Sequence, residues 1–342
     1  MLTKVGVLQG TLESIVGAER SHRLFEVLNV SGALMEESGA SISRAGIAQV
    51  LNMMLFEDLL NRVPDAKLYA EDCLRDGKKI MHDHGAVRTV ALSGMGALPA
   101  GEEAITRILR PLGYALNGVY PLERLKMTGR SYAQVEYPEE LAQFFVSELH
   151  PDRFSAEFQA AVQRVTSTSR DPLTAEAKAL LVELEAQRSL PVEKAVALLP
   201  VLAKVFSRQH DDPALADYEI LLAESAEMAW IATEGNAFNH ATDRVIDVDR
   251  LAEEQKALGR AMKATVETSQ SGRVRQTAFL AARVRRNFRI EGGSLIEKEV
   301  PGSFYEFITR LPLPAEDGTT KLDLSFDSSN AQAIFKVTAN QK

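Results

Sequence analysis

Apolar side chains recur every three or four residues through much of the stretch from about residue 11 to residue 80. This spacing places them on one face of an α-helix, so the stretch predicts several helices. The clearest helical pattern ends at the breaker Val63-Pro64-Asp65 and is carried by Ala48, Val50, Leu51, Met54, Leu55, Leu59 and Leu60.

From about residue 82 to residue 147 the pattern changes to short apolar or alternating runs separated by glycine and proline. Such runs are typical of β-strands, and they predict strands at residues 86–92, 132–137 and 143–147. Strand-like runs return after about residue 231, at residues 288–290, 303–309 and 322–326. Between the two strand-rich blocks, residues 155–230 are rich in Ala, Leu and Glu and predict helices. Prolines are expected to break this helical block at Pro172, Pro191, Pro200 and Pro213.

Two strand blocks around a helical block indicate an α+β fold, with one sheet assembled from both blocks. The length of 342 residues permits either one large domain or two. We expect a single domain over residues 1–342. Its parts are N-terminal helices (1–80), a first β module (81–150), a helical insertion (151–230) and a second β module (231–342).

Composition and charge narrow the classes of function. The net charge of −8 does not favour a nucleic-acid partner. The basic run Arg273–Arg286 is interpreted as a solvated face of a strand or helix, with a phosphate site as the alternative. Cys73 is the single cysteine, which excludes an intramolecular disulfide, and its acidic neighbours disfavour a reactive thiolate. Because the sequence shows no signal-peptide layout and no apolar run of about 18 residues, we expect a cytoplasmic location and no membrane partner.

Three of the six histidines lie in settings typical of solvated or capping residues. His22 belongs to a charged helical segment, His150 precedes a proline, and His210 precedes two aspartates. We expect none of these three to carry chemistry.

Residues 82–90 hold an unusual set of polar side chains for a strand. In an extended segment, residues 82, 84, 86, 88 and 90 share one face, because side chains alternate across a strand. That face presents His82, His84 and Arg88 with only Ala86 between the histidines and the arginine. A separation of four residues corresponds to about 13 Å along a strand, and the arginine side chain shortens this to the size of a small carboxylic acid. A surface strand with scattered polar positions explains the pattern equally well, and periodicity does not choose between the two histidines.

Two later segments add further candidates. His240 lies in a polar, loop-like stretch and is weak evidence alone. Glu306 would share a strand face with Phe304 and Ile308, where an unpaired carboxylate costs several kcal/mol and so requires a cation. That cation is either a metal ion or an arginine such as Arg310. Two histidines and one carboxylate would form the facial triad that holds non-haem Fe(II), although the sequence spacing does not establish this group.

Three segments, Asp83–Val90, Phe238–Val245 and Gly302–Phe307, resemble in order the motifs of the 2-oxoadipate dioxygenase/decarboxylase family. This family was long catalogued as a domain of unknown function, and the resemblance runs from about residue 20 to residue 340. It implies a single catalytic domain of the vicinal-oxygen-chelate type, related to hydroxymandelate synthase and hydroxyphenylpyruvate dioxygenase. In such a fold a curved β-sheet surrounds a metal ion.

The resemblance also implies roles for individual residues. His84, His240 and Glu306 would be the ligands of Fe(II), which leaves His82 as a neighbour of the site. Arg88 would bind the distal carboxylate of the substrate. Ser329 and Asn330, in a C-terminal segment similar to the closing segment of the family, would contact the substrate through backbone amides.

The implied reaction converts 2-oxoadipate and O2 to 2-hydroxyglutarate and CO2, a step of lysine degradation in bacterial members of the family. The sequence departs from the family pattern at Asp243, where proline is commoner, and at Lys336-Val337-Thr338. These departures bear on substrate preference rather than on the metal ligands. Two alternatives stay open: a metal-dependent lyase, isomerase or hydrolase that consumes no O2, and a non-catalytic acid-binding protein. The sequence indicates no oligomeric state.

Overall fold

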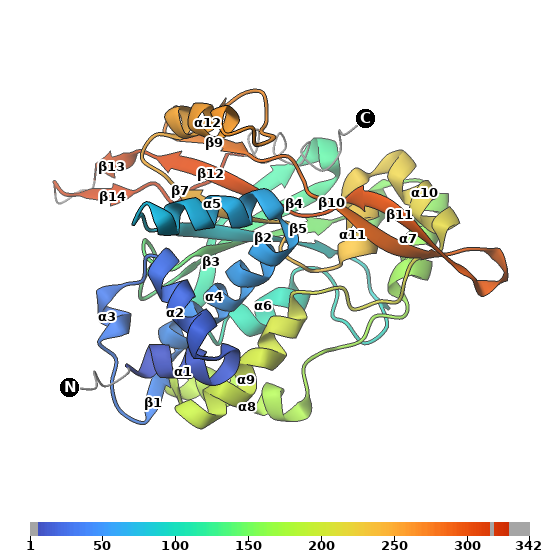
Figure 1. Ribbon diagram of the computed structural model, residues 1–342. Coiled ribbons are helices and arrows are strands. Elements are labelled where there is room, and N and C mark those ends of the chain that lie inside the picture. The colour runs from blue at the N-terminus through green and yellow to red at the C-terminus, as the bar shows by residue number, and fades with distance from the viewer. Residues whose placement is uncertain (1–5, 315–317, 328–342) are drawn as a thin grey trace.

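The computed structural model describes residues 6–314 and 318–327. Its centre is a curved eight-stranded sheet with the strand order β3-β4-β5-β2-β7-β12-β9-β8 (Figure 1). The strands are β2 (His82–Val90), β3 (Tyr114–Leu122), β4 (Met127–Gln134), β5 (Gln143–Leu149), β7 (His240–Arg244), β8 (Glu267–Thr268), β9 (Val274–Ala278) and β12 (Phe304–Arg310). Half of these strands come from the first strand-rich block and half from the second, so the sheet is assembled from both.

The two blocks meet in the middle of the sheet. β2 pairs in parallel with β5 and antiparallel with β7, and β7 pairs in parallel with β12. In this register Thr242 of β7 is opposite His84 of β2 on one side and Glu306 of β12 on the other. Residues opposite one another on neighbouring strands point to the same face of a sheet. Side chains that are more than 200 positions apart in the sequence therefore lie at one level of the sheet.

One face of the sheet, called here the outer face, packs against helices from the N-terminal part, the first strand-rich block and the central block. These helices are α1 (Val7–Val16), α2 (Ala18–Val27), α3 (Gly32–Met35), α4 (Arg44–Arg62), α5 (Pro64–Arg75), α6 (Glu103–Leu109), α8 (Ala175–Gln187) and α9 (Val192–Val205). α4 begins after Ser43, whose hydroxyl accepts a hydrogen bond from the Gly46 amide at 2.9 Å. It ends at Arg62, because Pro64 disfavours helical geometry in the residue before it, Val63.

Gly85 shows how closely the outer face packs. A Cβ atom at this position would lie 2.3 Å from the ring of Phe238. Only glycine lets β2 approach that ring, which explains the glycine directly after His84.

The opposite face, called here the inner face, carries His84, His240 and Glu306 and packs a second core. Its surroundings are α7 (Ala156–Thr166), α10 (Leu215–Glu224), α11 (Ala226–Glu234) and a hairpin of β10 (Arg283–Arg289) and β11 (Leu295–Pro301) that projects from the body (Figure 1). α12 (Val248–Ala257) lies beside β9 and β12. The short elements are β1 (Ser41–Ser43), β6 (Ser189–Pro191), β13 (Pro312–Pro314), β14 (Thr320–Leu322), η1 (Glu123–Leu125), η2 (Pro151–Arg153) and η3 (Glu291–Gly293).

The structure confirms the α+β class and the curved sheet but corrects several local predictions. Pro200 lies inside α9 rather than breaking it, because Leu199 and Leu202 on either side of it are buried in the same core. β4 covers residues 127–134 rather than 132–137. The strand expected at residues 322–326 is also wrong, since β14 ends at Leu322 and residues 323–327 have no regular structure.

The structure also tests the surface predictions. His22 is exposed, as expected, but His210 is buried with Nε2 2.9 Å from the carbonyl oxygen of Ala232. Arginines of the basic run form ion pairs with carboxylates, including Arg283 with Glu299 and Arg285 with Glu297 on the hairpin. These pairs support a solvated face rather than a phosphate site. Among the described residues, no helix combines the length and apolar character needed to cross a membrane.

Candidate metal centre

Three potential metal ligands from adjacent strands meet on the inner face. Nε2 of His240 lies 3.1 Å from Oε2 of Glu306 and 3.4 Å from Nε2 of His84. The distance from His84 Nε2 to Glu306 Oε2 is 4.0 Å. One ligand atom from each residue falls within 4.8 Å of the others, and all three residues are buried. Sequence reasoning named these three residues, and the structure brings them together.

Asp83 orients the first histidine of this group. Its Oδ1 lies 2.8 Å from Nδ1 of His84. Because a carboxylate is an acceptor, Nδ1 carries the proton and Nε2 is left with a lone pair directed toward His240 and Glu306. Burial acts to raise the pKa of Asp83, but Arg310 and His84 outweigh it and hold the pKa below its usual value. Asp83 therefore stays charged and fixes the tautomer that a metal ion requires.

The electrostatics of the group favour a bound cation. Burial raises the pKa of Glu306 to about 8 and lowers the pKa of both His84 and His240. Burial thus favours two neutral imidazoles beside a carboxyl group that has lost most of its hydration. Among the described residues, the nitrogen bases within 4.0 Å of the Glu306 carboxylate are these two histidines, and Arg310 pairs with Asp83 instead. A divalent ion would restore the charged carboxylate, and two imidazoles with one carboxylate match the donor set of non-haem Fe(II). The residues therefore fit a metal ion.

His82 does not share the inner face with His84, which corrects the prediction from periodicity. The register of β2 against β7 shifts between these two residues, as at a β-bulge. The ring of His82 packs 5.3 Å from that of Phe56 in the outer core, whereas the ring of His84 packs 5.4 Å from that of His240. The structure gives His82 a packing position and leaves His84 in the metal group.

Arg88 is fully buried four residues after His84 on β2. Its guanidinium carbon lies 4.8 Å from the ring centroid of Trp230 on α11, and the side-chain amide of Asn236 donates to its backbone carbonyl at 2.7 Å. Burial lowers the pKa of Arg88 to about 10, while Glu227 acts in the opposite direction. The group remains a cation at neutral pH, held against an aromatic face.

The family model described as 2-oxoadipate dioxygenase/decarboxylase matches residues 47–341. The chain belongs to this family. The resemblance inferred from three short motifs is therefore confirmed.

Two similar proteins have solved structures that bear on the fold. A putative glyoxalase superfamily protein from Ralstonia eutropha JMP134 has 54% sequence identity and a TM-score of 0.89, with 94% of this chain and 98% of that chain covered. The hydroxyglutarate synthase of Oryza sativa, solved in complex with 2-oxoadipate, has 21% identity and a TM-score of 0.67, with 87% and 93% covered. At that lower identity the likeness shows the fold alone.

A relative with an assigned activity has a lower sequence identity than the Ralstonia eutropha protein. The chloroplastic 2-oxoadipate dioxygenase/decarboxylase of Arabidopsis thaliana is 22% identical over 360 residues, which cover 94% of this chain and 87% of that protein. The family is thus established across most of the chain.

Sequence reasoning assigned no role at the metal group to Asp83, Trp230 or Phe326, and it offered Arg310 only as a possible partner of Glu306. Phe326 packs edge-on against His84, with ring centroids 4.8 Å apart, and Arg310 lies against the Phe326 ring. The sequence signals for Asp83 and Arg310 were a carboxylate directly before the histidine and an arginine at the end of the Glu306 strand. Trp230 and Phe326 gave no such signal. Ser329 and Asn330 lie outside the described residues.

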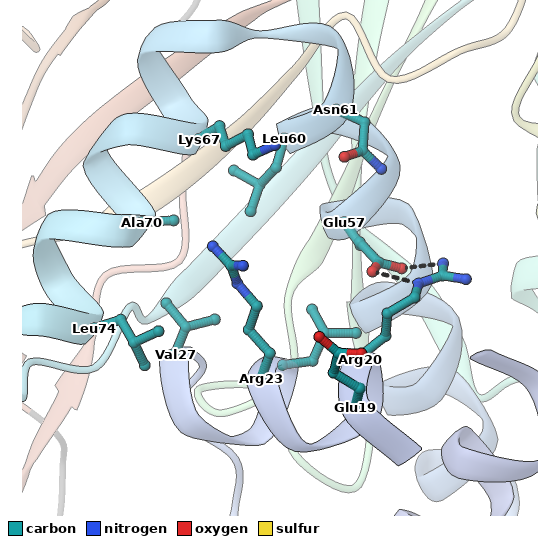
Figure 2. A pocket seen from close by; sticks show the side chains of 11 residues that line it. Glu19, Arg20, Arg23, Val27, Glu57, Leu60, Asn61, Lys67, Ala70 and Leu74 are labelled. Atoms are coloured by element: carbon teal, nitrogen blue, oxygen red, sulfur yellow. Dashed lines mark hydrogen bonds and ion pairs between the residues drawn. The ribbon is translucent and has the colours of Figure 1, made fainter. Parts of the chain in front are cut away.

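A surface pocket of about 270 Å³ lies away from the metal group, between α2, α4 and α5. In Figure 2 dashed lines join Arg20 to Glu57, and the Arg23 side chain extends from α2 toward α5. The lining of the pocket comes from these helices and includes none of the proposed metal ligands. This pocket is therefore not the candidate site.

Proposed function

We propose that this protein is an Fe(II)-dependent dioxygenase that converts 2-oxoadipate to 2-hydroxyglutarate and CO2. The observation that carries the proposal is the buried group of His84, His240 and Glu306 in a member of this family. The Oryza sativa structure in complex with 2-oxoadipate supports a 2-oxo dicarboxylic acid as the substrate. Because the three ligands come from both strand-rich blocks, we also propose that the chain acts as a single catalytic domain.

The proposed reaction balances without an external reductant. 2-Oxoadipate and O2 together contain the atoms of 2-hydroxyglutarate and CO2, with one oxygen atom in the new carboxylate and the other in the new hydroxyl group. When bound to the three ligands, Fe(II) would supply open coordination positions for the 2-oxo acid and dioxygen. The two neutral imidazoles and one carboxylate leave net positive charge there, which favours an anionic substrate.

The side chains of this protein would bind and orient the substrate. Arg88 would hold its distal carboxylate, because a guanidinium forms two parallel hydrogen bonds with a carboxylate in one geometry. Its position four residues from His84 would then set the length of acid that reaches both groups. Asp83 would keep His84 in the tautomer that binds metal. Ser329 and Asn330 remain part of the proposal as further substrate contacts.

Oxygen consumption tests this proposal directly. Purified protein loaded with Fe(II) should consume O2 and release CO2 in equal amounts when 2-oxoadipate is added. His84→Ala should bind no iron and consume no O2, because it removes one ligand of three. His22→Ala provides a matched control, since His22 is exposed on α2 and far from the metal group in the fold. Full turnover by His84→Ala would overturn the metal assignment, and product formation without O2 would indicate a lyase instead.

A further inference from the structure

Arg310, at the end of β12, forms hydrogen bonds with two separate parts of the chain. Its side chain is 0% exposed. Its Nε donates to both carboxylate oxygens of Asp83, at 3.1 and 3.0 Å, and Nη2 donates to Oδ1 at 2.9 Å. Its Nη1 donates to the backbone carbonyls of Asp323 and Ser325, at 2.9 and 2.7 Å. One guanidinium therefore joins the carboxylate that orients His84 to a segment near the C-terminal end of the described chain.

This segment, residues 323–327, is called here the strap. Besides a hydrogen bond from the Gln270 amide to the Asp327 carboxylate at 3.1 Å, it contacts strands of the first block. The side-chain amides of Asn117 and Gln143 each donate to the Leu324 carbonyl at 3.3 Å. The Phe326 amide donates to the hydroxyl of Tyr120 at 3.1 Å. The strap thus connects the end of β12 to β3 and β5.

The strap also contacts a proposed metal ligand. Phe326 packs its ring against His84 at a centroid distance of 4.8 Å and an interplanar angle of 89°. The guanidinium of Arg310 lies 4.8 Å from the centre of the same Phe326 ring. His84 is therefore restrained from two sides, by Asp83 at Nδ1 and by Phe326 against its ring.

We propose that Arg310 is a positioning residue that couples docking of the strap to the orientation of His84. The inference rests on the proposed metal centre. When the strap is docked, its two carbonyls fix the guanidinium plane, which in turn fixes Asp83 and the imidazole. When the strap leaves, Nη1 loses its acceptors and the His84 ring loses its Phe326 contact. Metal binding and strap docking then favour one another, because two linked equilibria must affect each other equally.

Metal affinity and strap protection, measured separately from turnover, test this coupling. Arg310→Lys keeps the charge but loses the planar fork that serves both partners. We expect it to weaken binding of Fe(II) or Co(II) about 10- to 100-fold, the usual effect of removing a partner of a metal ligand. Its Co(II) complex should show a changed visible spectrum, which reports the ligand geometry. Adding metal to the wild-type protein should slow hydrogen exchange of the amides of residues 324–327, and this protection should be lost in Arg310→Lys.

Two further variants make the test specific. Arg107→Lys is the matched control, since Arg107 makes a comparable two-donor pair with Asp171, at 2.9 and 2.8 Å, on other elements. It should leave metal affinity unchanged. Tyr120→Phe removes one strap contact without touching Arg310 and should weaken metal binding several-fold. If Arg310→Lys does not fold, Tyr120→Phe decides the question.

The outcomes separate this inference from the metal centre itself. Wild-type protein that binds no divalent metal would overturn the metal centre and the inference with it. Wild-type protein that binds metal, with unchanged affinity and spectrum in Arg310→Lys, would overturn the coupling alone. Equal losses in Arg310→Lys and Arg107→Lys would also overturn it, because they would indicate general destabilisation. For Tyr120→Phe, unchanged affinity together with strap exchange that does not respond to metal would contradict the coupling.

Discussion

Replacing Arg88 with lysine tests whether this side chain binds the distal carboxylate of the substrate. Arg88 is fully buried, its guanidinium lies against Trp230, and its backbone carbonyl is held by Asn236. Lysine retains the charge and most of the length of arginine but loses the planar pair of donors. The change therefore removes one directed hydrogen bond to the substrate while leaving the metal ligands in place.

The expected loss follows from the energy of that hydrogen bond. A hydrogen bond to a charged group contributes about 1.5–3 kcal/mol. At 1.36 kcal/mol for each factor of ten, Arg88→Lys should lower kcat/KM for 2-oxoadipate about 10- to 150-fold. Arg88→Ala leaves the substrate carboxylate without a partner, which costs about 3–5 kcal/mol, or about 150- to 5,000-fold.

The assay compares two substrates by oxygen uptake. 2-Oxohexanoate has the chain length of 2-oxoadipate with a methyl group in place of the distal carboxylate. The wild-type protein should prefer 2-oxoadipate strongly, and Arg88→Lys should reduce this preference while iron content stays unchanged. An undiminished preference in the variant would refute the assignment of Arg88, and an equal loss on both substrates would show a structural role instead.

Three other predictions address the ligands, the support of Arg88 and the pH dependence of folding. Glu306→Ala should abolish Fe(II) binding, measured as metal content after reconstitution. The melting temperature of the metal-free protein should stay unchanged or rise, because the substitution removes a buried carboxyl group. Retained stoichiometric iron would contradict the assignment of Glu306 as a ligand. Trp230→Leu should raise KM for 2-oxoadipate more than it changes kcat, because it removes the aromatic ring against which the Arg88 guanidinium packs. An effect on kcat alone would argue against a role of Trp230 in holding Arg88. Burial raises the pKa of Asp243 to about 7 from 3.8, so its contribution to stability is complete below pH 3.8 and is lost as the pH rises through 7. Asp243→Asn should remove this dependence, which amounts to about 3 kcal/mol between pH 5 and pH 8.5, and denaturant unfolding at these two pH values measures it. Parallel pH profiles in both proteins would contradict the prediction.

The sequence predicts the class of fold well because its periodicity reflects burial directly. The helical pattern before Val63 and the strand pattern around Glu306 both correspond to real elements. Prediction from the sequence fails where tertiary contacts replace regular secondary structure. Residues 322–326 are predicted as a strand, yet the carbonyls of Asp323 and Ser325 are bound by the Arg310 side chain rather than by a neighbouring strand.

The candidate site shows a similar limit. Periodicity placed His82 and His84 on one face, and it would be right for a regular strand. A single register shift between them reverses the face of His82, and nothing in the local composition marks that shift. The choice of His84 came from the family resemblance, and the ring contacts of the two histidines agree with it.

The distribution of buried charge explains why Glu306 is left for a metal ion. The sequence offered Arg310 as its partner, but the structure shows that Arg310 pairs with Asp83. Lys263 acts to lower the pKa of Glu306, yet its ammonium group is paired with Glu267. Lys263 and Arg310, the described cations that act to lower the pKa of Glu306, are thus paired with other carboxylates. A carboxylate buried beside two imidazoles, with the nearby cations paired elsewhere, is stable in its charged form when a metal ion supplies the missing positive charge.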